Sequence, residues 1–70
     1  MAPNEFARLK RGDVVSPADG WLIGFSVVLY AFEFIKFNIQ TGNVELVSLG
    51  GRHTIDVPRD EFLARFHVVY

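Results

Sequence analysis

The sequence has no cysteine and almost no net charge, and both absences narrow what the protein can be. Without cysteine, the chain can form neither a disulfide-stapled scaffold nor a cysteine-ligated metal site. Seven basic residues stand against eight acidic ones, and the resulting net charge of −1 gives no bulk attraction to a polyanion. These absences leave a domain whose behaviour is governed by its apolar residues.

A long apolar run and an export signal are also missing. The longest uncharged apolar stretch, residues 21–32, is shorter than the run of about 18 residues that a membrane-spanning helix needs. Residues 1–5 show no basic segment leading into an apolar one, which is the pattern of a secretory signal. We therefore expect a cytoplasmic protein, and the small size of the chain favours a gene carried by a phage or another mobile element.

What the sequence does have is apolar side chains. Half of the 70 residues are hydrophobic and 14% are aromatic, including seven phenylalanines. This composition excludes intrinsic disorder, which needs low hydrophobicity and high net charge. A chain of this length forms one domain, residues 1–70, and such a domain buries only about 60% of the surface of its unfolded chain. The sequence therefore carries more apolar surface than one small core readily takes up.

Hydrophobic periodicity and turn residues predict an all-β domain with two short helices. Turns are expected at residues 17–20, 41–43 and 50–51, where proline, glycine and asparagine favour turn conformations. Gly24 suggests a bulge or sharp bend inside its strand. The expected elements are a helical turn over residues 4–10, strands over 13–15, 21–30, 35–40, 44–47, 53–57 and 67–70, and a helix that Pro58 opens before the last strand.

Residues 25–34 are apolar at both parities, which sets them apart from the other predicted strands. A small barrel has one interior, and each strand sends only alternate residues into it. One of the two sets should therefore face outward unless a helical segment covers it, and we expect the outward set to be the even-numbered one. The change of phase at residues 31–34 is compatible with a turn or with a bulge. The odd-numbered residues are Phe25, Val27, Leu29 and Ala31, and the even-numbered ones are Val28, Tyr30, Phe32 and Phe34.

The layout of short strands, glycine-rich turns and a helical turn before the last strand resembles that of the SH3-like small β-barrels. The resemblance rests on residues 11–15 (Arg-Gly-Asp-Val-Val) as the opening strand and on residues 55–58 (Ile-Asp-Val-Pro) running into 62–66 (Phe-Leu-Ala-Arg-Phe). It implies a five-stranded barrel with a helical turn at the N-terminus and a short helix before the last strand. Plasmid-encoded type II dihydrofolate reductases are similar in layout. Their substrate-contacting Val-Gln-Ile-Tyr stretch is replaced here by residues 54–58, so that activity is not carried over.

The excess of apolar residues favours a non-catalytic regulatory or binding protein that acts through protein–protein contacts. An exposed apolar patch marks a binding surface, and interfaces between permanent partners are more hydrophobic than other protein surfaces. We therefore expect the chain to associate with itself, as a homodimer, through the outward face of residues 25–34. The expected interface residues are Val28, Tyr30, Phe32, Phe34 and Lys36.

Two other classes of function stay open. Arg8, Lys10 and Arg11 form a small basic cluster that, together with Trp21, matches the combination of cationic and stacking groups in proteins that bind single-stranded nucleic acid. The dihydrofolate-reductase-like layout leaves room for an oligomeric enzyme with its site on a symmetry axis.

The remaining chemistry-bearing residues have simpler explanations. The two histidines, His53 and His67, lie far apart in a chain without cysteine, which does not favour a metal site. No serine lies in a Gly-x-Ser-x-Gly motif. Asp56, Asp60 and Glu61 lie where acidic side chains stabilise the start of a helix. We expect no catalytic residues, no cofactor and no metal.

Overall fold

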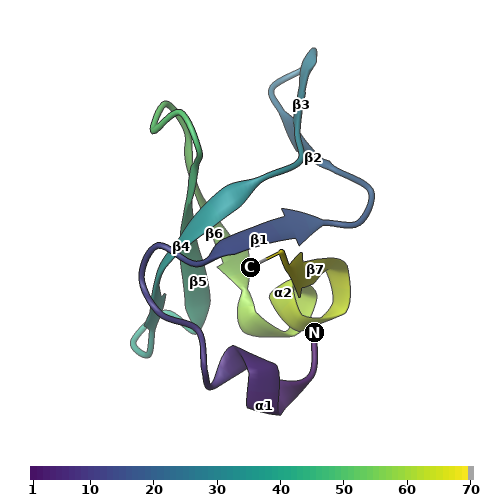
Figure 1. Cartoon of the computed structure of the whole chain (residues 1–70). Helices are drawn as coiled ribbons and strands as arrows, with labels where there is room; N and C mark the ends of the chain where they lie inside the picture. Colours follow the sequence, from purple (N-terminus) through teal and green to yellow (C-terminus); the bar gives the residue numbers. More distant parts are fainter. Residues whose placement is uncertain (70) are drawn as a thin grey trace.

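The computed structural model describes residues 1–69, and across these the chain is mostly β, with two antiparallel sheets and two short helices (Figure 1). The fold class expected from the sequence is confirmed at this level. The elements are α1 (Pro3–Phe6), β1 (Val14–Pro17), β2 (Trp21–Ile23), β3 (Val27–Leu29), β4 (Phe32–Asn38), β5 (Asn43–Ser48), β6 (Thr54–Pro58), α2 (Arg59–Arg65) and β7 (Phe66–Val68).

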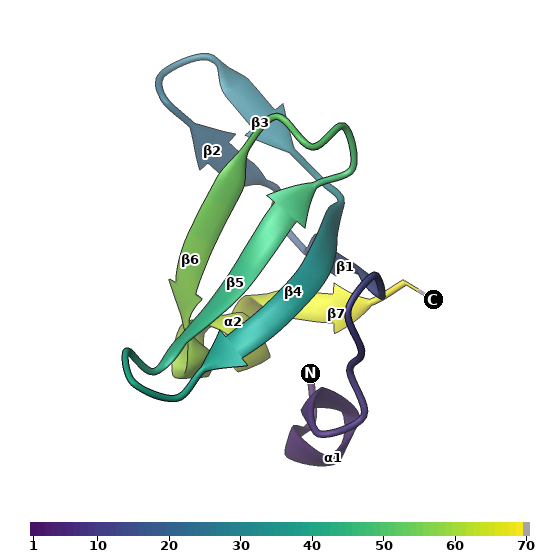
Figure 2. The same ribbon diagram turned by 90° about the vertical axis from the view of Figure 1, so that its left-hand side faces the viewer.

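The larger sheet has five strands in the order β6-β5-β4-β1-β7, and the smaller sheet is the hairpin β2-β3. Figure 2 shows β6, β5 and β4 side by side as a meander, with the hairpin β2–β3 at one end of the molecule and α1 at the other. All pairings are antiparallel. Within residues 1–69, β6 and β7 are the outer strands and do not pair, so the sheet is not closed into a barrel.

The core lies between the sheet and α2. Phe62 and Phe66, one helical turn apart, stack with ring centroids 4.9 Å apart, and Phe66 also meets Phe32 of β4. The meander contributes alternate residues of β5 and β6, as the pleat of a strand requires. The buried cluster consists of Val15, Phe32, Phe34, Val44, Leu46, Val57, Phe62 and Phe66.

The expected single strand over residues 21–30 is wrong. The chain turns back at residues 24–26, and β2 pairs with β3 so that Leu22 lies opposite Val28. Gly24 supplies the turn with a positive φ of 63°, a conformation that costs other residues strain. Glycine inside an apolar run marks a bulge or a turn equally well, and here it marks a turn.

This hairpin also corrects the expected outward face. Phe32 and Phe34 were expected among the interface residues, but they are 0% and 8% exposed and belong to the core. The chain leaves β3 at Leu29 and enters the larger sheet at Phe32, so even-numbered residues on the two sides of this link do not share a face. The further change of phase is a bulge, because the β4–β5 register shifts between Phe34 and Lys36.

The N-terminal helix is shorter than expected and begins earlier. It spans Pro3–Phe6 and is capped at Ala2, whose N–H donates to the Glu5 carboxylate at 3.0 Å, rather than at Asn4. Its Phe6 ring packs edge-on against Phe34, Phe37 and Phe62, and the Arg59 guanidinium lies 5.1 Å from the ring centroid. The helix therefore covers the end of the core that lies away from the hairpin.

Candidate functional site

The hairpin β2–β3 has one face on the core and one in solvent. Trp21 and Leu29, which are opposite each other, are half-buried and pack against the core cluster. Leu22 and Val28, the next opposite pair, point to the other face and are 59% and 44% exposed. An isolated two-stranded hairpin is only marginally stable in water, so the contacts of Trp21 and Leu29 hold this one to the body of the protein.

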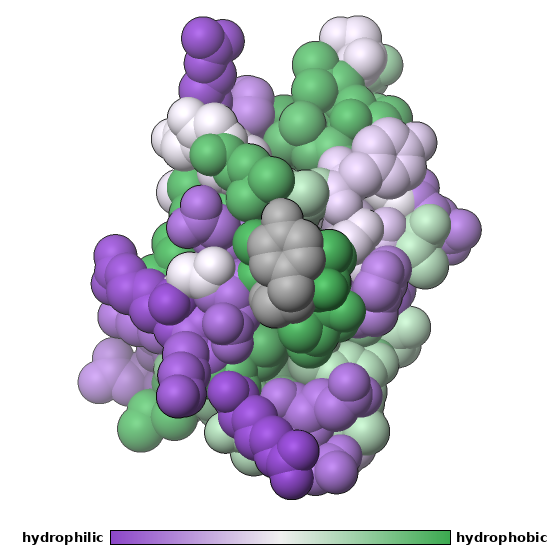
Figure 3. Space-filling view, viewed as in Figure 1, coloured by the Kyte–Doolittle hydropathy of each residue, from purple (hydrophilic) through white to green (hydrophobic). Residues whose placement is uncertain are grey.

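Most of the exposed residues of the hairpin are apolar: Leu22 and Val28 lie on its outward face, and Val27, next to the tip, is exposed on the other face. We call the five large exposed residues of the hairpin the hairpin patch: Leu22, Phe25, Val27, Val28 and Tyr30. No charged residue occurs between Gly20 and Phe32 in the sequence, and Figure 3 shows apolar surface gathered over the hairpin, away from the hydrophilic lower part of the molecule. From residue sizes of about 150–250 Å² the patch exposes roughly 600 Å², the upper end for a single apolar patch on a monomer.

Contacts with α2 hold the base of the hairpin, the end where the chain enters and leaves it, which we call its root. The Arg65 guanidinium lies 4.6 Å from the centroid of the Trp21 ring, and the same ring packs at 5.6 Å against Phe66. Nη2 of Arg65 also donates to the Gly20 carbonyl at 3.4 Å, while Nη1 forms an ion pair with Glu61 at 2.8 Å. The N–H of Ala18, in turn, donates to the Arg65 carbonyl at 2.9 Å. One residue therefore joins the helix to the turn that starts the hairpin.

Replacing Arg65 with alanine should loosen this root. Loss of the cation–π contact and of the hydrogen bond to Gly20 should lower the free energy of unfolding by about 1 kcal/mol. Because Trp21 is the single tryptophan, its fluorescence emission should shift as its ring gains water. Arg52→Ala is the control, because it removes an equally cationic exposed side chain that lies on the groove rim and not over Trp21. Equal changes in stability and emission for the two variants would show that Arg65 does not hold the hairpin.

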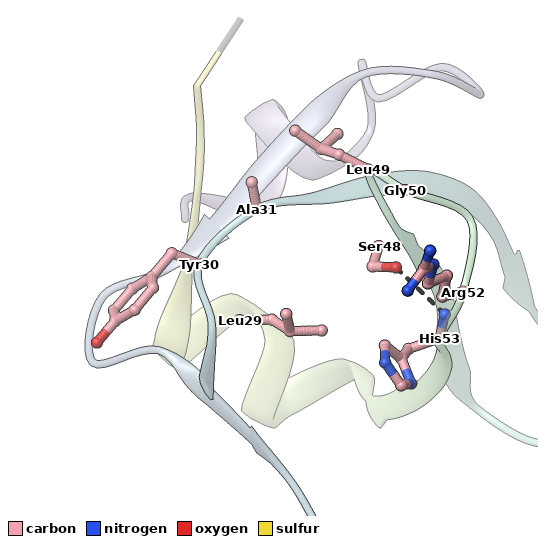
Figure 4. Close-up of a pocket in the computed structure, with 8 residues that line it drawn as sticks. All are labelled: Leu29, Tyr30, Ala31, Ser48, Leu49, Gly50, Arg52 and His53. Carbon is pink, nitrogen blue, oxygen red and sulfur yellow. Dashed lines mark hydrogen bonds between the residues drawn. The ribbon is translucent and has the colours of Figure 1, made fainter. Parts of the chain in front are cut away.

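A groove of about 400 Å³ opens between the hairpin root and the β5–β6 turn. Leu29 and His53 point toward each other across it, and the dashed bond in Figure 4 joins the His53 N–H to Ser48 Oγ at 3.2 Å. None of the described residues that line the groove is acidic, whereas Arg52 on its rim is cationic. The lining residues are Leu29, Tyr30, Ala31, Ser48, Leu49, Gly50, Arg52 and His53.

The structure brings together only part of the expected interface. Val28 and Tyr30 are exposed on the hairpin. Lys36 is also exposed, but it lies on β4 opposite Glu45, beyond the bulge. Phe32 and Phe34 lie in the core, so the surface that the sequence placed over residues 25–34 lies instead over residues 22–30.

The residues proposed for nucleic-acid contact do not form one surface. Arg8, Lys10 and Arg11 are exposed in the loop between α1 and β1. Trp21 lies in β2, and α1 and β2 are at opposite ends of the molecule (Figures 1 and 2). Its ring is in contact with Arg65 and Phe66, which leaves little of it for stacking on a base. A small pocket of about 240 Å³ beside Arg8 is lined by acidic Glu5 and Asp13 as well.

The other polar candidates have structural partners or stand apart. Ser48 is 7% exposed, and its hydroxyl accepts the His53 N–H. Asp60 and Glu61 lie in the first turn of α2, as expected from the helix dipole. His67 is exposed on β7. Among residues 1–69 no three side chains of the histidine, aspartate or glutamate type gather as a metal site would require.

Comparison with protein-family models, curated proteins and solved structures gives no match to this chain. Within residues 1–69, neither helix has the length and apolar character needed to cross a membrane. The expected cytoplasmic location stays a prediction.

Sequence reasoning missed Leu22, Phe25 and the groove. The sequence held one signal for Phe25. Gly24-Phe25-Ser26 puts a phenylalanine between two turn-forming residues, and a side chain at the tip of a turn is exposed. The groove has no such signal, because its two walls come from segments far apart in the sequence.

Proposed function

We propose that this protein is a non-catalytic binding module that associates with a second copy of itself through the hairpin patch. The observation that carries the proposal is the exposure of five large apolar side chains on one uncharged hairpin, with Phe25 at 102% and Tyr30 at 61%. An apolar strand pair with open edges is a surface that associates with other chains unless charge or cover prevents it. The hairpin itself carries no charged side chain, and Leu22 and Val28 on its outward face are exposed.

A second copy is the partner whose chemistry fits best. In a two-fold dimer the same surface meets itself, so a charged patch would place like charges together. The hairpin patch has no charge to repel its own copy. Its roughly 600 Å², with a polar rim, approaches the about 800 Å² per partner of a standard interface.

We also infer that the domain is an open relative of the SH3-like small barrels. The five-stranded antiparallel sheet and the helix between β6 and β7 support this layout. The hairpin is then an elaboration of the connection between β1 and β4, which are neighbours in the sheet. A binding surface on an inserted loop of a rigid scaffold is a common arrangement.

Self-association is tested by the mass of the protein in solution. Sedimentation and light scattering from micromolar to millimolar concentration should show a species of about twice the 7.9 kDa chain mass. Val28→Asp should give a monomer, because each copy then carries a carboxylate in the apolar patch through which the two copies would meet. Ile39→Ser removes an apolar side chain that is 84% exposed on the distant β4–β5 turn, and this variant should dimerise normally. A wild-type monomer throughout this range would refute the proposal.

A further inference from the structure

Phe25 is the residue that the fold of a single chain leaves unexplained. At the tip of the hairpin, between β2 and β3, it is 102% exposed, more than any other large apolar residue of the described chain. Burying a phenylalanine removes a large apolar area from water and stabilises the assembly that does so. A fully exposed ring is therefore a candidate anchor for an interface, where aromatic residues supply much of the binding energy.

The groove beside the hairpin root has the properties of a receptor for such a ring. Leu29, Ala31 and Leu49 supply apolar walls, and its volume of about 400 Å³ is sufficient for an aromatic side chain. Arg52 on the rim can place its guanidinium over an aromatic face, an arrangement that Arg59 and Arg65 already adopt over Phe6 and Trp21 within the chain. The groove is open to solvent, so a ring can enter from outside.

The hairpin has the right length for Phe25 of one copy to reach the groove of the other. Each strand has three residues, so the tip lies about 10 Å from the root at the usual rise of a strand. When two hairpins pack side by side in opposite directions about a two-fold axis, the tip of each lies at the root of the other. The groove is at the root, since Leu29, Tyr30 and Ala31 line it.

We propose that in the dimer Phe25 of each copy fills the groove of the other, under Arg52. This inference rests on the self-association proposed above and adds the contact that determines its geometry. The contact is reciprocal, as two-fold symmetry requires. It closes the assembly at two copies, because both tips and both grooves are used.

The first test removes the ring. Phe25→Ser deletes two anchors per dimer and should weaken dimerisation about 100-fold in sedimentation equilibrium, since a tenfold change corresponds to about 1.4 kcal/mol and each buried ring contributes at least that. Ile39→Ser, an exposed apolar residue outside the hairpin, is the matched control and should leave the dissociation constant unchanged.

The second test blocks the groove with a new side chain. It then measures whether a variant with a blocked groove and a variant without the Phe25 ring dimerise better together than each does alone. Gly50 lines the groove, has no positive φ, and a Cβ added there meets no atom within 4 Å, so the backbone accepts a side chain at this position. We expect the ring of Gly50→Phe to obstruct the groove. Gly50→Phe alone should be as weak a dimer as Phe25→Ser alone. A mixture of the two variants should form a heterodimer about tenfold tighter than either homodimer, because one intact ring then meets one intact groove.

The outcomes separate this inference from the proposal beneath it. A monomeric wild-type protein overturns both. A wild-type dimer that Phe25→Ser leaves intact, or equal weakness of the mixture and the single variants, overturns the ring-in-groove contact and leaves self-association standing. If the emission of Trp21 shows that Gly50→Phe is misfolded, Leu49→Glu replaces it, because Leu49 also lines the groove and is 51% exposed.

Discussion

Replacing Phe62 with alanine is expected to unfold most of the protein at 25 °C. The side chain is 0% exposed, stacks on Phe66 at 4.9 Å and meets the edge of Phe6 at 5.8 Å. Truncating a buried phenylalanine costs about 3–5 kcal/mol, and a single core in a chain of this size supplies about that much stability in total. The change removes the ring that joins both helices to the sheet.

Circular dichroism during urea unfolding measures this effect. Leu63→Ala, which truncates the neighbouring half-buried residue of α2, is the control and should cost clearly less. A Phe62→Ala protein with a cooperative transition within about 1 kcal/mol of the wild type would mean that the core does not depend on this ring.

Gly20→Ala is expected to displace the hairpin. Gly20 has a φ of 77°, and a Cβ there would lie 2.5 Å from Val28 Cγ1 and 2.9 Å from Tyr30 Cε1. The backbone strain costs about 1–2 kcal/mol and the overpacking about 1–3 kcal/mol. We expect a total loss of about 2–5 kcal/mol, with a change in Trp21 emission because this residue follows directly.

Gly42→Ala separates the two contributions. Gly42 has the same φ of 77°, but a Cβ there meets nothing within 4 Å. Thermal unfolding should show a loss of stability from backbone strain alone for Gly42→Ala. For Gly20→Ala the loss should be larger, because it includes the overpacking against Val28 and Tyr30. Equal losses in the two variants would contradict the close packing of Val28 and Tyr30 over Gly20.

The sequence predicts the second half of the fold well because its signals are local. Strands β5 and β6 alternate more buried with less buried residues. The turns at 41–43 and at Gly50-Gly51 fall where glycine permits them. The final helix follows Pro58 and has acidic residues first and Arg65 last, as the helix dipole favours. In each case pattern, turn chemistry and charge agree.

The first half of the chain is predicted less well, because its sequence signals are ambiguous. A hairpin of apolar residues and a single apolar strand have the same periodicity, so Gly24 could not be assigned to a turn from the sequence. Once the turn at 24–26 is known, Val28 and Phe32 no longer belong to one strand. The contact of Arg65 with Trp21 joins residues far apart in the chain, and no local sequence pattern predicts such a contact.

The strand order also has a consequence for how the chain folds. The meander β4–β5–β6 forms from residues close in sequence, whereas β7 joins the sheet only by pairing with β1, Val15 opposite Val68. Contacts between distant positions carry a larger loop-closure entropy and slow folding. The meander can therefore form early, but Val15 and Phe66 complete the core only when the two ends of the chain meet. We therefore expect the pairing of β1 with β7 to be the slowest step of folding.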